Sequence, residues 1–171
     1  MPREHFGPQH PFLPRDELLT YEEMAFVTAS LLPLGLQKIR LTGGEPLLRK
    51  NITTLIQQLR ALDPSLDIAL TTNGALLFEH ATSLKEAGLN RVTVSLDALD
   101  EDTFQSLADT TKHTPKVILK GIQKAADVGL GVKVNTVVKK GVNDAEILPL
   151  AEKFESMGVP LRFIEFMDVG N

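Results

Sequence analysis

Residues 35–46 read GLQKIRLTGGEP, and this stretch indicates how the chain is built. A glycine suited to the left-handed end of a helix comes first, and polar and apolar side chains then alternate over residues 38–42. Such alternation is typical of a β-strand, and the Gly-Gly-Glu-Pro that follows points to a tight turn. We therefore expect a helix end, a short link, a strand and a turn in succession.

The same unit recurs along the chain. A glycine followed by leucine or valine precedes a strand-like run at Gly35, Gly88, Gly129 and Gly158, and a fifth run, residues 67–71, follows Pro64. Between the runs lie amphipathic stretches that we interpret as helices. Their apolar stripes are Ile52, Leu55, Ile56 and Leu59; Leu77, Ala81 and Leu84; Ile118, Ile122 and Ala125; and Ile147, Leu148, Ala151 and Phe154. This alternation predicts an α/β fold with five parallel strands.

The first part of the chain has a different character. Four prolines within residues 1–17 predict an extended lead-in without regular structure. Thr20 and Glu23 have the spacing of a capping box, which marks the start of a helix that Pro33 and Gly35 end. A length of 171 residues fits one domain, made of this lead-in and a barrel portion over residues 18–171.

Strand parity favours an incomplete TIM-like (β/α) barrel over a doubly wound sheet. A doubly wound sheet is covered by helices on both faces and should be apolar on both. Here each of three strands has one polar face and one apolar face. The polar positions are Lys38, Arg40 and Thr42; Arg91, Thr93 and Ser95; and Lys133 and Asn135. We expect helices outside the sheet and a polar lumen inside it.

Composition limits the classes of function. A net charge of −4 argues against a nucleic-acid binder, and no apolar run is long enough to span a membrane. The N-terminus lacks the apolar segment of a secretory signal, so we expect a cytoplasmic protein. There is no cysteine, which excludes disulfides, thiolate catalysis and thiolate-bound metals within this chain, and the four histidines are scattered. We therefore assign no metal ligand and no catalytic side chain.

Polar residues and glycines gather where the strands end. These clusters are residues 42–46, residues 71–74, residues 95–97, Asn135 and residues 165–168. In parallel barrels the carboxyl ends of the strands form the active-site face, so the pattern predicts a binding site there. Each cluster also has a purely structural explanation, as a tight turn or, for Asp97 and Asp144, as a helix cap.

Arg40 and Lys133 strengthen the prediction of a ligand. An unpaired cation directed into a barrel costs several kcal/mol, on the order of the penalty for any buried charge. Either acids such as Glu45 and Glu165 pair with these cations, or the cations bind an anionic ligand. Their place near the carboxyl ends of the strands favours the ligand.

Several stretches resemble the radical S-adenosylmethionine enzymes. Residues 42–46 (TGGEP) are similar to the GGEP motif, which holds the methionine amino group in those enzymes. The surrounding sequence resembles the GTP 3′,8-cyclase family, also called molybdenum-cofactor biosynthesis protein A. The stretches that carry this resemblance are residues 12–15 (FLPR), 19–23 (LTYEE), 38–47 (KIRLTGGEPL), 70–74 (LTTNG), 92–97 (VTVSLD) and 162–171 (RFIEFMDVGN).

The resemblance implies ligands for particular residues. Those matching positions that contact S-adenosylmethionine are Gly44, Ser95 and Met167, with Gly43, Glu45 and Asn135 as further candidates. Those matching positions that contact GTP are Arg40, Thr71 and Lys133. Strand parity independently places Arg40 and Lys133 in the lumen, where a triphosphate would satisfy both cations.

The family's chemistry is likewise implied by the resemblance. A reduced [4Fe–4S] cluster cleaves S-adenosylmethionine to a 5′-deoxyadenosyl radical, which removes the ribose 3′ hydrogen of GTP. The carbon radical closes onto guanine C8 and leads to 3′,8-cyclo-7,8-dihydro-GTP in molybdenum cofactor biosynthesis. The family holds its clusters with a Cys-x3-Cys-x2-Cys loop and a second cysteine set, and this chain contains neither. We therefore expect part of a cyclase that is inactive alone.

Two other functions remain open. One is a nucleotide- or S-adenosylmethionine-binding module that has no clusters and no catalysis. The other is an unrelated phosphate-binding barrel of the aldolase type, for which Lys133 would serve as the Schiff-base lysine. In the cyclase interpretation the first barrel strand is missing, so residues 38–41 should form an exposed edge. Such an edge should pair with another chain, for example in a homodimer, or be covered by the lead-in.

Overall fold

The computed structural model describes residue 14, residues 17–108 and residues 112–167. Within them five parallel strands form one sheet, in the order β1-β2-β3-β4-β5. The strands are β1 (Lys38–Leu41), β2 (Asp67–Thr72), β3 (Arg91–Ser95), β4 (Gly131–Val138) and β5 (Leu161–Glu165). A doubly wound sheet reverses its strand order at a switch point, whereas this order never reverses. The predicted α/β fold with five parallel strands is confirmed, and the winding is that of a barrel segment.

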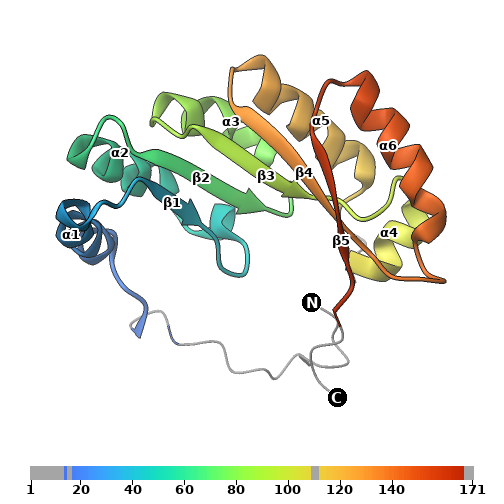
Figure 1. Cartoon of the computed structure of the whole chain (residues 1–171), viewed down its shortest axis with the longest axis horizontal. Coiled ribbons are helices and arrows are strands. Elements are labelled where there is room, and N and C mark those ends of the chain that lie inside the picture. The colour runs from blue at the N-terminus through green and yellow to red at the C-terminus, as the bar shows by residue number, and fades with distance from the viewer. Residues whose placement is uncertain (1–13, 15–16, 109–111, 168–171) are drawn as a thin grey trace.

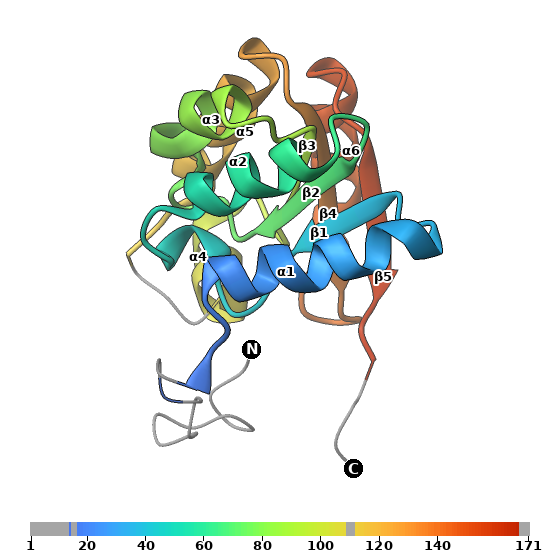
Figure 2. The same ribbon diagram turned by 90° about the vertical axis from the view of Figure 1, so that its left-hand side faces the viewer.

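Six helices connect or flank the described strands. They are α1 (Tyr21–Leu31), α2 (Ile52–Leu62), α3 (Leu77–Glu86), α4 (Glu101–Ala108), α5 (Pro115–Asp127) and α6 (Ile147–Ser156). Figure 1 shows α2, α3, α5 and α6 along one face of the sheet, and Figure 2 shows α1 beside α2 at the β1 end. The sequence did not predict α4, because only Phe104 of its eight residues is buried and its apolar stripe is short.

Local signals in the sequence set the ends of the elements. The predicted capping box is present: the Thr20 hydroxyl accepts a bond from the Glu23 N–H at 3.1 Å, and the Glu23 carboxylate accepts one from the Thr20 N–H at 2.7 Å. All four glycines that were predicted to end helices have positive φ, from 64° at Gly158 to 100° at Gly88. A residue with a Cβ is strained in this conformation, so glycine allows the chain to turn at once into the next strand.

The core lies between the sheet and its covering helices. The predicted stripes of α2, α3 and α5 are buried there, and so are Ile68, Leu70 and Val94 on the facing side of the sheet. One predicted core residue is wrong: Leu148 is 71% exposed. Leu150 and Phe154 instead carry the buried face of α6, because residues four apart lie on the same side of a helix.

The sheet has two ends. Within the described residues β1 has only β2 as a neighbour and β5 has only β4, so the predicted edge at β1 is confirmed. Most of the proline-rich lead-in lies outside the described residues. Homodimer formation through this edge stays a prediction. In the part of the chain that the structure describes, no helix is long and apolar enough to cross a membrane.

Candidate functional site

One face of the sheet lies opposite α2, α3, α5 and α6 (Figure 1), and we call it the open face. Its residues are mostly polar. Parallel pairing arranges its side chains in rows across the strands. Its members are Lys38, Arg40, Asp67, Ala69, Thr71, Arg91, Thr93, Ser95, Lys133, Asn135 and Arg162. The intervening residues of β2 and β3 point into the core and are buried, whereas those of the edge strands, such as Ile39, Leu41 and Leu161, are only partly buried. The polar wall predicted from strand parity therefore exists.

Arg40 lies across the middle of this wall. Its Nη1 donates to the hydroxyl of Thr71 at 3.1 Å and approaches that of Thr93 at 3.5 Å. Thr71, Thr93 and Lys133 form one row across β2, β3 and β4. The three residues that the resemblance links to GTP thus lie on one patch, with the two cations on either side of a threonine floor.

Neither cation is neutralised by an acid. Among the described residues, no carboxylate oxygen lies within 4.0 Å of Arg40 or Lys133, and the Lys133 ammonium makes no hydrogen bond with any of them. Glu45 and Glu165, the acids considered as partners from the sequence, do not pair with either cation. Arg40 and Lys133 are therefore available positive charges on the open face, as an anion site requires.

The Gly-Gly-Glu-Pro loop follows β1 at the carboxyl end of the sheet. Both oxygens of Glu45 are engaged within the protein: Oε1 accepts from the Thr72 hydroxyl at 2.8 Å and the Leu47 N–H at 3.0 Å, and Oε2 accepts from the Asn73 N–H at 2.8 Å. Glu45 thereby ties this loop to the end of β2. Nothing lies within 4 Å of the position that a Cβ would occupy at Gly44, so its main chain is open to a ligand.

Ser95 and Asn135 face each other across β3 and β4 as the last pair of the register. The Asn135 Oδ1 is buried and has no hydrogen-bond partner among the described residues. A buried acceptor without a donor is uncommon in folded proteins and asks for an explanation. A ligand that donates a hydrogen bond to the Asn135 Oδ1 would supply the missing partner.

Asp97 follows Ser95 by two residues and is not a helix cap. Its Oδ1 accepts from the Val137 N–H at 2.8 Å, and burial raises the pKa of its carboxyl above the ordinary value. Asp100 is the residue next to α4 whose Oδ1 accepts from the Thr103 N–H, at 2.9 Å. Asp144 bonds the Gly141 N–H at 2.8 Å within the preceding loop. The capping explanation is therefore wrong for Asp97 and unsupported for Asp144.

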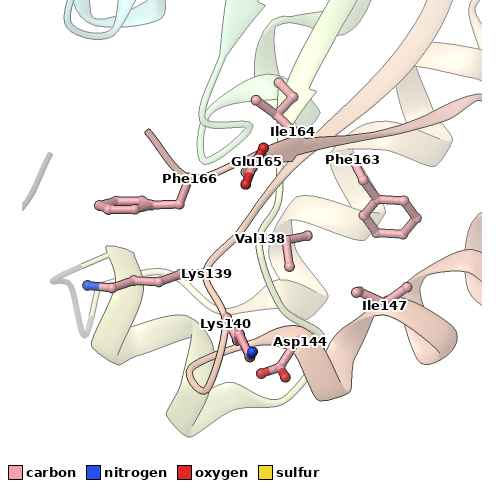
Figure 3. A pocket seen from close by; sticks show the side chains of 9 residues that line it. All are labelled: Val138, Lys139, Lys140, Asp144, Ile147, Phe163, Ile164, Glu165 and Phe166. Carbon is pink, nitrogen blue, oxygen red and sulfur yellow. The ribbon is translucent and has the colours of Figure 1, made fainter. Parts of the chain in front are cut away.

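A cavity of about 620 Å³ lies where β4 and β5 end (Figure 3). It is lined by Val138, Lys139, Lys140, Asp144, Ile147, Phe163, Ile164, Glu165 and Phe166. The Lys139 ammonium sits 4.8 Å from the centre of the Phe166 ring, and the Phe166 N–H donates to the Val138 carbonyl at 3.0 Å. Met167 directly follows Phe166, and its side chain is 71% exposed at the same end of the sheet.

Known proteins resemble this chain in sequence and in structure. The model of the radical SAM superfamily matches residues 3–154. This chain belongs to the radical SAM superfamily. A GTP 3′,8-cyclase of Staphylococcus epidermidis is 48% identical over all 171 residues, and one of Staphylococcus aureus strain JH9 is 49% identical. The chain spans about half the length (50%) of each of these curated relatives.

Two solved structures share the fold of this chain. The structure described as native anSMEcpe with bound AdoMet aligns with 91% of this chain and 45% of its own, at a TM-score of 0.70 and 17% identity. Methylornithine synthase aligns with 87% of this chain and 44% of its own, at a TM-score of 0.64 and 22% identity. At these identities the likeness concerns the fold, and it supports the barrel interpretation.

Sequence reasoning missed two polar residues of the wall, Asp67 and Arg162. Arg162 pairs in register with Asn135 and therefore shares the open face, where it is exposed and forms no ion pair with a described residue. The alternation of Leu161, Arg162 and Phe163 could have revealed it. The strand is a weak signal of parity, however, because its two polar residues, Arg162 and Glu165, lie on opposite faces.

The residues of this chain do not fit an iron–sulfur cluster. Such clusters are held by cysteine thiolates, and the sequence has no cysteine. In the described part of the chain, moreover, no group of three or more His, Asp or Glu side chains is placed to hold a metal ion. The residues present do fit S-adenosylmethionine. The unpartnered Asn135 Oδ1 and the open main chain at Gly44, which could both contact such a ligand, lie at the same end of the sheet.

Proposed function

We propose that this chain forms a substrate-binding wall of a GTP 3′,8-cyclase that acts in molybdenum cofactor biosynthesis. The observation that carries the proposal is the pair Arg40 and Lys133, two cations without acid partners on a floor of threonines. The chain that contains this pair is 48% identical, over all of its own 171 residues, to half of a GTP 3′,8-cyclase. A nucleoside triphosphate supplies the multiple negative charge that such a patch binds best.

The two cations have different tasks in the proposed GTP site. The Arg40 guanidinium is planar and has several donors, so it binds two phosphate oxygens while the Thr71 hydroxyl holds its orientation. The Lys133 ammonium is a point charge on a flexible stem, so it follows the phosphate rather than orienting it. Together they fix the triphosphate and leave the ribose and base to extend toward the carboxyl ends of the strands.

S-adenosylmethionine is proposed to bind at those strand ends. Gly44 offers open main-chain groups, the Ser95 hydroxyl donates or accepts, and the Asn135 Oδ1 accepts from a hydroxyl or ammonium group of the ligand. Met167 contributes an exposed side chain beyond β5. Gly43 and Glu45 act by shaping the loop, because the Glu45 carboxylate is already committed to Thr72 and Asn73.

Gly44, Ser95 and Asn135 would hold S-adenosylmethionine, which would supply hydrogen-abstracting radical chemistry once an external donor had reduced it by one electron. The residues of this chain bind and orient the two ligands, and they place the ribose of GTP beside the cofactor. We assign no step through an iron–sulfur cluster, since this chain has no thiolate to hold one.

Isothermal titration of the chain with nucleotides tests the proposed GTP site. We expect the affinity to decrease from GTP to GDP to guanosine, because each lost phosphate removes charge from Arg40 and Lys133. S-adenosylmethionine should bind to the GTP complex as well, since its site is separate. Equal binding of GTP and guanosine, or no binding of GTP, would refute the assignment.

The absence of cysteine favours a second candidate, a nucleotide- or S-adenosylmethionine-binding module without catalysis. Anaerobic reconstitution with iron and sulfide, followed by dithionite and an assay for 5′-deoxyadenosine, separates the two candidates. The isolated chain should give no product. A chain extended upstream with a Cys-x3-Cys-x2-Cys segment should give product if the cyclase proposal is right and none if the module is right. Product from the isolated chain would contradict both.

A further inference from the structure

Strand β4 continues past the end of β3, and this overhang needs polar partners. The last register pair is Ser95 with Asn135, whereas β4 runs on to Val138. Just beyond the pair, the Leu96 N–H still donates to the Asn135 carbonyl at 3.0 Å, and the buried Thr136 hydroxyl donates to the Leu96 carbonyl at 2.6 Å. Beyond the Ser95–Asn135 pair, side chains therefore take over from the regular main-chain hydrogen bonds between β3 and β4.

Two residues complete the replacement, and we call them the Asp97–Asn143 clamp. The Asp97 carboxylate accepts from the Val137 N–H at 2.8 Å. The Asn143 Nδ2 donates to the carbonyls of Asp97 at 2.8 Å and Val137 at 2.9 Å, and its Oδ1 accepts from the Lys139 N–H at 2.8 Å. Asn143 is only 1% exposed, so its amide serves the protein rather than a ligand.

The clamp joins β3 to β4 next to Ser95 and Asn135, the two residues that the proposed cofactor site needs. Asp97 and Val137 each come two residues after Ser95 and Asn135, the residues that share the last pair of the register. A ligand that bonds both side chains spans two strands, so its affinity depends on how firmly the strands are held at that point. Side chains that bind a ligand well are held within about 0.5 Å of their working positions by the bonds behind them.

We propose that Asp97 and Asn143 are positioning residues for S-adenosylmethionine, acting by fixing Ser95 and Asn135 at their spacing. This inference rests on the proposed function, which places the cofactor at those two residues. The GTP patch lies one row away and is held by the regular pairing of β2, β3 and β4. Loss of the clamp should therefore weaken the binding of S-adenosylmethionine and leave the binding of GTP almost unchanged.

The opposite end of the sheet offers a matched control. The Asn90 Oδ1 accepts from the Ile68 N–H at 2.8 Å and from the Arg60 Nη2 at 2.6 Å, just before β3 begins. Asn90 joins β2 to the start of β3 much as Asn143 joins β3 to the end of β4. A variant at Asn90 thus loses a comparable side-chain bridge, five residues before Ser95.

The test is isothermal titration of the full chain with S-adenosylmethionine and, separately, with GTP. Asp97→Ala and Asn143→Ala should raise the Kd for S-adenosylmethionine about tenfold and the Kd for GTP less than about twofold. Asp97→Asn keeps an oxygen for the Val137 N–H and should restore nearly normal binding. Asn90→Ala should change neither Kd. If an alanine variant fails to fold, the near-isosteric Thr136→Val removes the bond to Leu96 and should weaken S-adenosylmethionine binding several-fold.

The possible outcomes separate this inference from the proposed function. Unchanged S-adenosylmethionine binding in Asp97→Ala or Thr136→Val, while Ser95→Ala weakens it, overturns the clamp and leaves the proposed site standing. Parallel losses for both ligands also overturn it, because they show a general loss of structure. If the unaltered chain binds no S-adenosylmethionine, or Ser95→Ala and Asn135→Ala bind it normally, the proposed cofactor site fails and the positioning role fails with it.

Discussion

Arg40 and Arg91 occupy the same row of the open face, on either side of Ala69, yet they have opposite environments. The Arg91 guanidinium meets the Asp67 carboxylate toward the amino ends of the strands. The Arg40 guanidinium turns toward the carboxyl ends and meets only the hydroxyls of Thr71 and Thr93 among the described residues. Neighbours therefore decide what the same residue type does: the charge of Arg91 is balanced by Asp67, whereas Arg40 retains its positive charge.

The difference predicts which arginine binds nucleotide. Arg40→Ala should weaken GTP binding by about 10- to 100-fold, because a charge-assisted hydrogen bond contributes roughly 1.5–3 kcal/mol. Lys133→Ala should have a similar effect. Arg91→Ala should leave the Kd for GTP within about twofold, since its charge is already balanced by Asp67. Isothermal titration at low and high salt checks this, and equal losses in all three variants would abolish the distinction between Arg91 and the other two cations.

Much of this comparison could be predicted from the sequence. Alternation along three strands placed Arg40, Arg91 and Lys133 on one face, and four glycines marked where four of the five strands begin. Both signals are local, because side-chain direction in a strand and a left-handed φ depend on nearby residues alone. The structure confirms the strands, the helix ends and the polar face.

What the sequence did not predict depends on distant contacts. Asp67 and Arg91 are 24 residues apart, and parity does not say toward which row an arginine side chain turns. The bond between Asp97 and Val137 spans 40 residues and arises because β4 overhangs β3. The burial of Leu148 was wrongly predicted for a related reason. The apolar residues of α6 lie on two adjacent faces of the helix, and only the position of the sheet decides which face is buried.

Two glycines at the carboxyl ends of the strands should differ in their roles, because Gly74 matters for stability and Gly44 for ligand binding. A Cβ at Gly74 would lie 2.8 Å from side-chain carbons of both Ile118 and Val94, and its φ is +79°. Gly74→Ala should therefore lower the free energy of unfolding by about 1–3 kcal/mol, as overpacked cores do. Gly44→Ala meets no atom within 4 Å and should change stability by less than about 0.5 kcal/mol.

Ligand binding should show the reverse order for these two variants. The added methyl of Gly44→Ala blocks close approach to the main chain, so we expect the Kd for S-adenosylmethionine to rise about tenfold. Urea unfolding and isothermal titration, carried out on both variants, check the two predictions together. Normal cofactor binding by Gly44→Ala would remove this loop from the proposed site.

The pair formed by Arg91 and Asp67 should matter only modestly for stability. The side chains of Arg91 and Asp67 are 37% and 36% exposed, so solvent weakens their attraction. Arg91→Ala should lower the free energy of unfolding by about 0.2–1 kcal/mol, less at high salt. Arg40→Ala removes a cation that has no acid partner and should leave stability unchanged or raise it slightly. Urea unfolding at two salt concentrations distinguishes these outcomes, and a larger loss for Arg40→Ala would contradict the assigned roles.

The smallest expected effect concerns Asp97, an acid near the carboxyl ends of the strands with no base within 4.0 Å among the described residues, in contrast to Asp67. Burial raises the pKa of the Asp97 carboxyl, so the folded state favours its protonated form. The stability that protonation contributes is full below the ordinary pKa of aspartate, about 3.9, and is lost as the pH rises through the higher pKa of the folded state. Asp97→Asn should therefore gain stability relative to the unaltered chain between pH 4 and pH 7.

Asp100, three residues away, provides a control of opposite sign. A hydrogen bond from the Thr103 N–H lowers the pKa of its carboxyl, so its contribution is present at neutral pH and is lost as the pH falls. Asp100→Asn should accordingly lose stability relative to the unaltered chain as the pH rises from about 3 to about 5. Urea unfolding of Asp97→Asn between pH 4 and pH 7, and of Asp100→Asn between pH 3 and pH 5, measures the slopes. Slopes of the same sign would show that burial does not govern Asp97, and the clamp would then hold an ordinary exposed carboxylate.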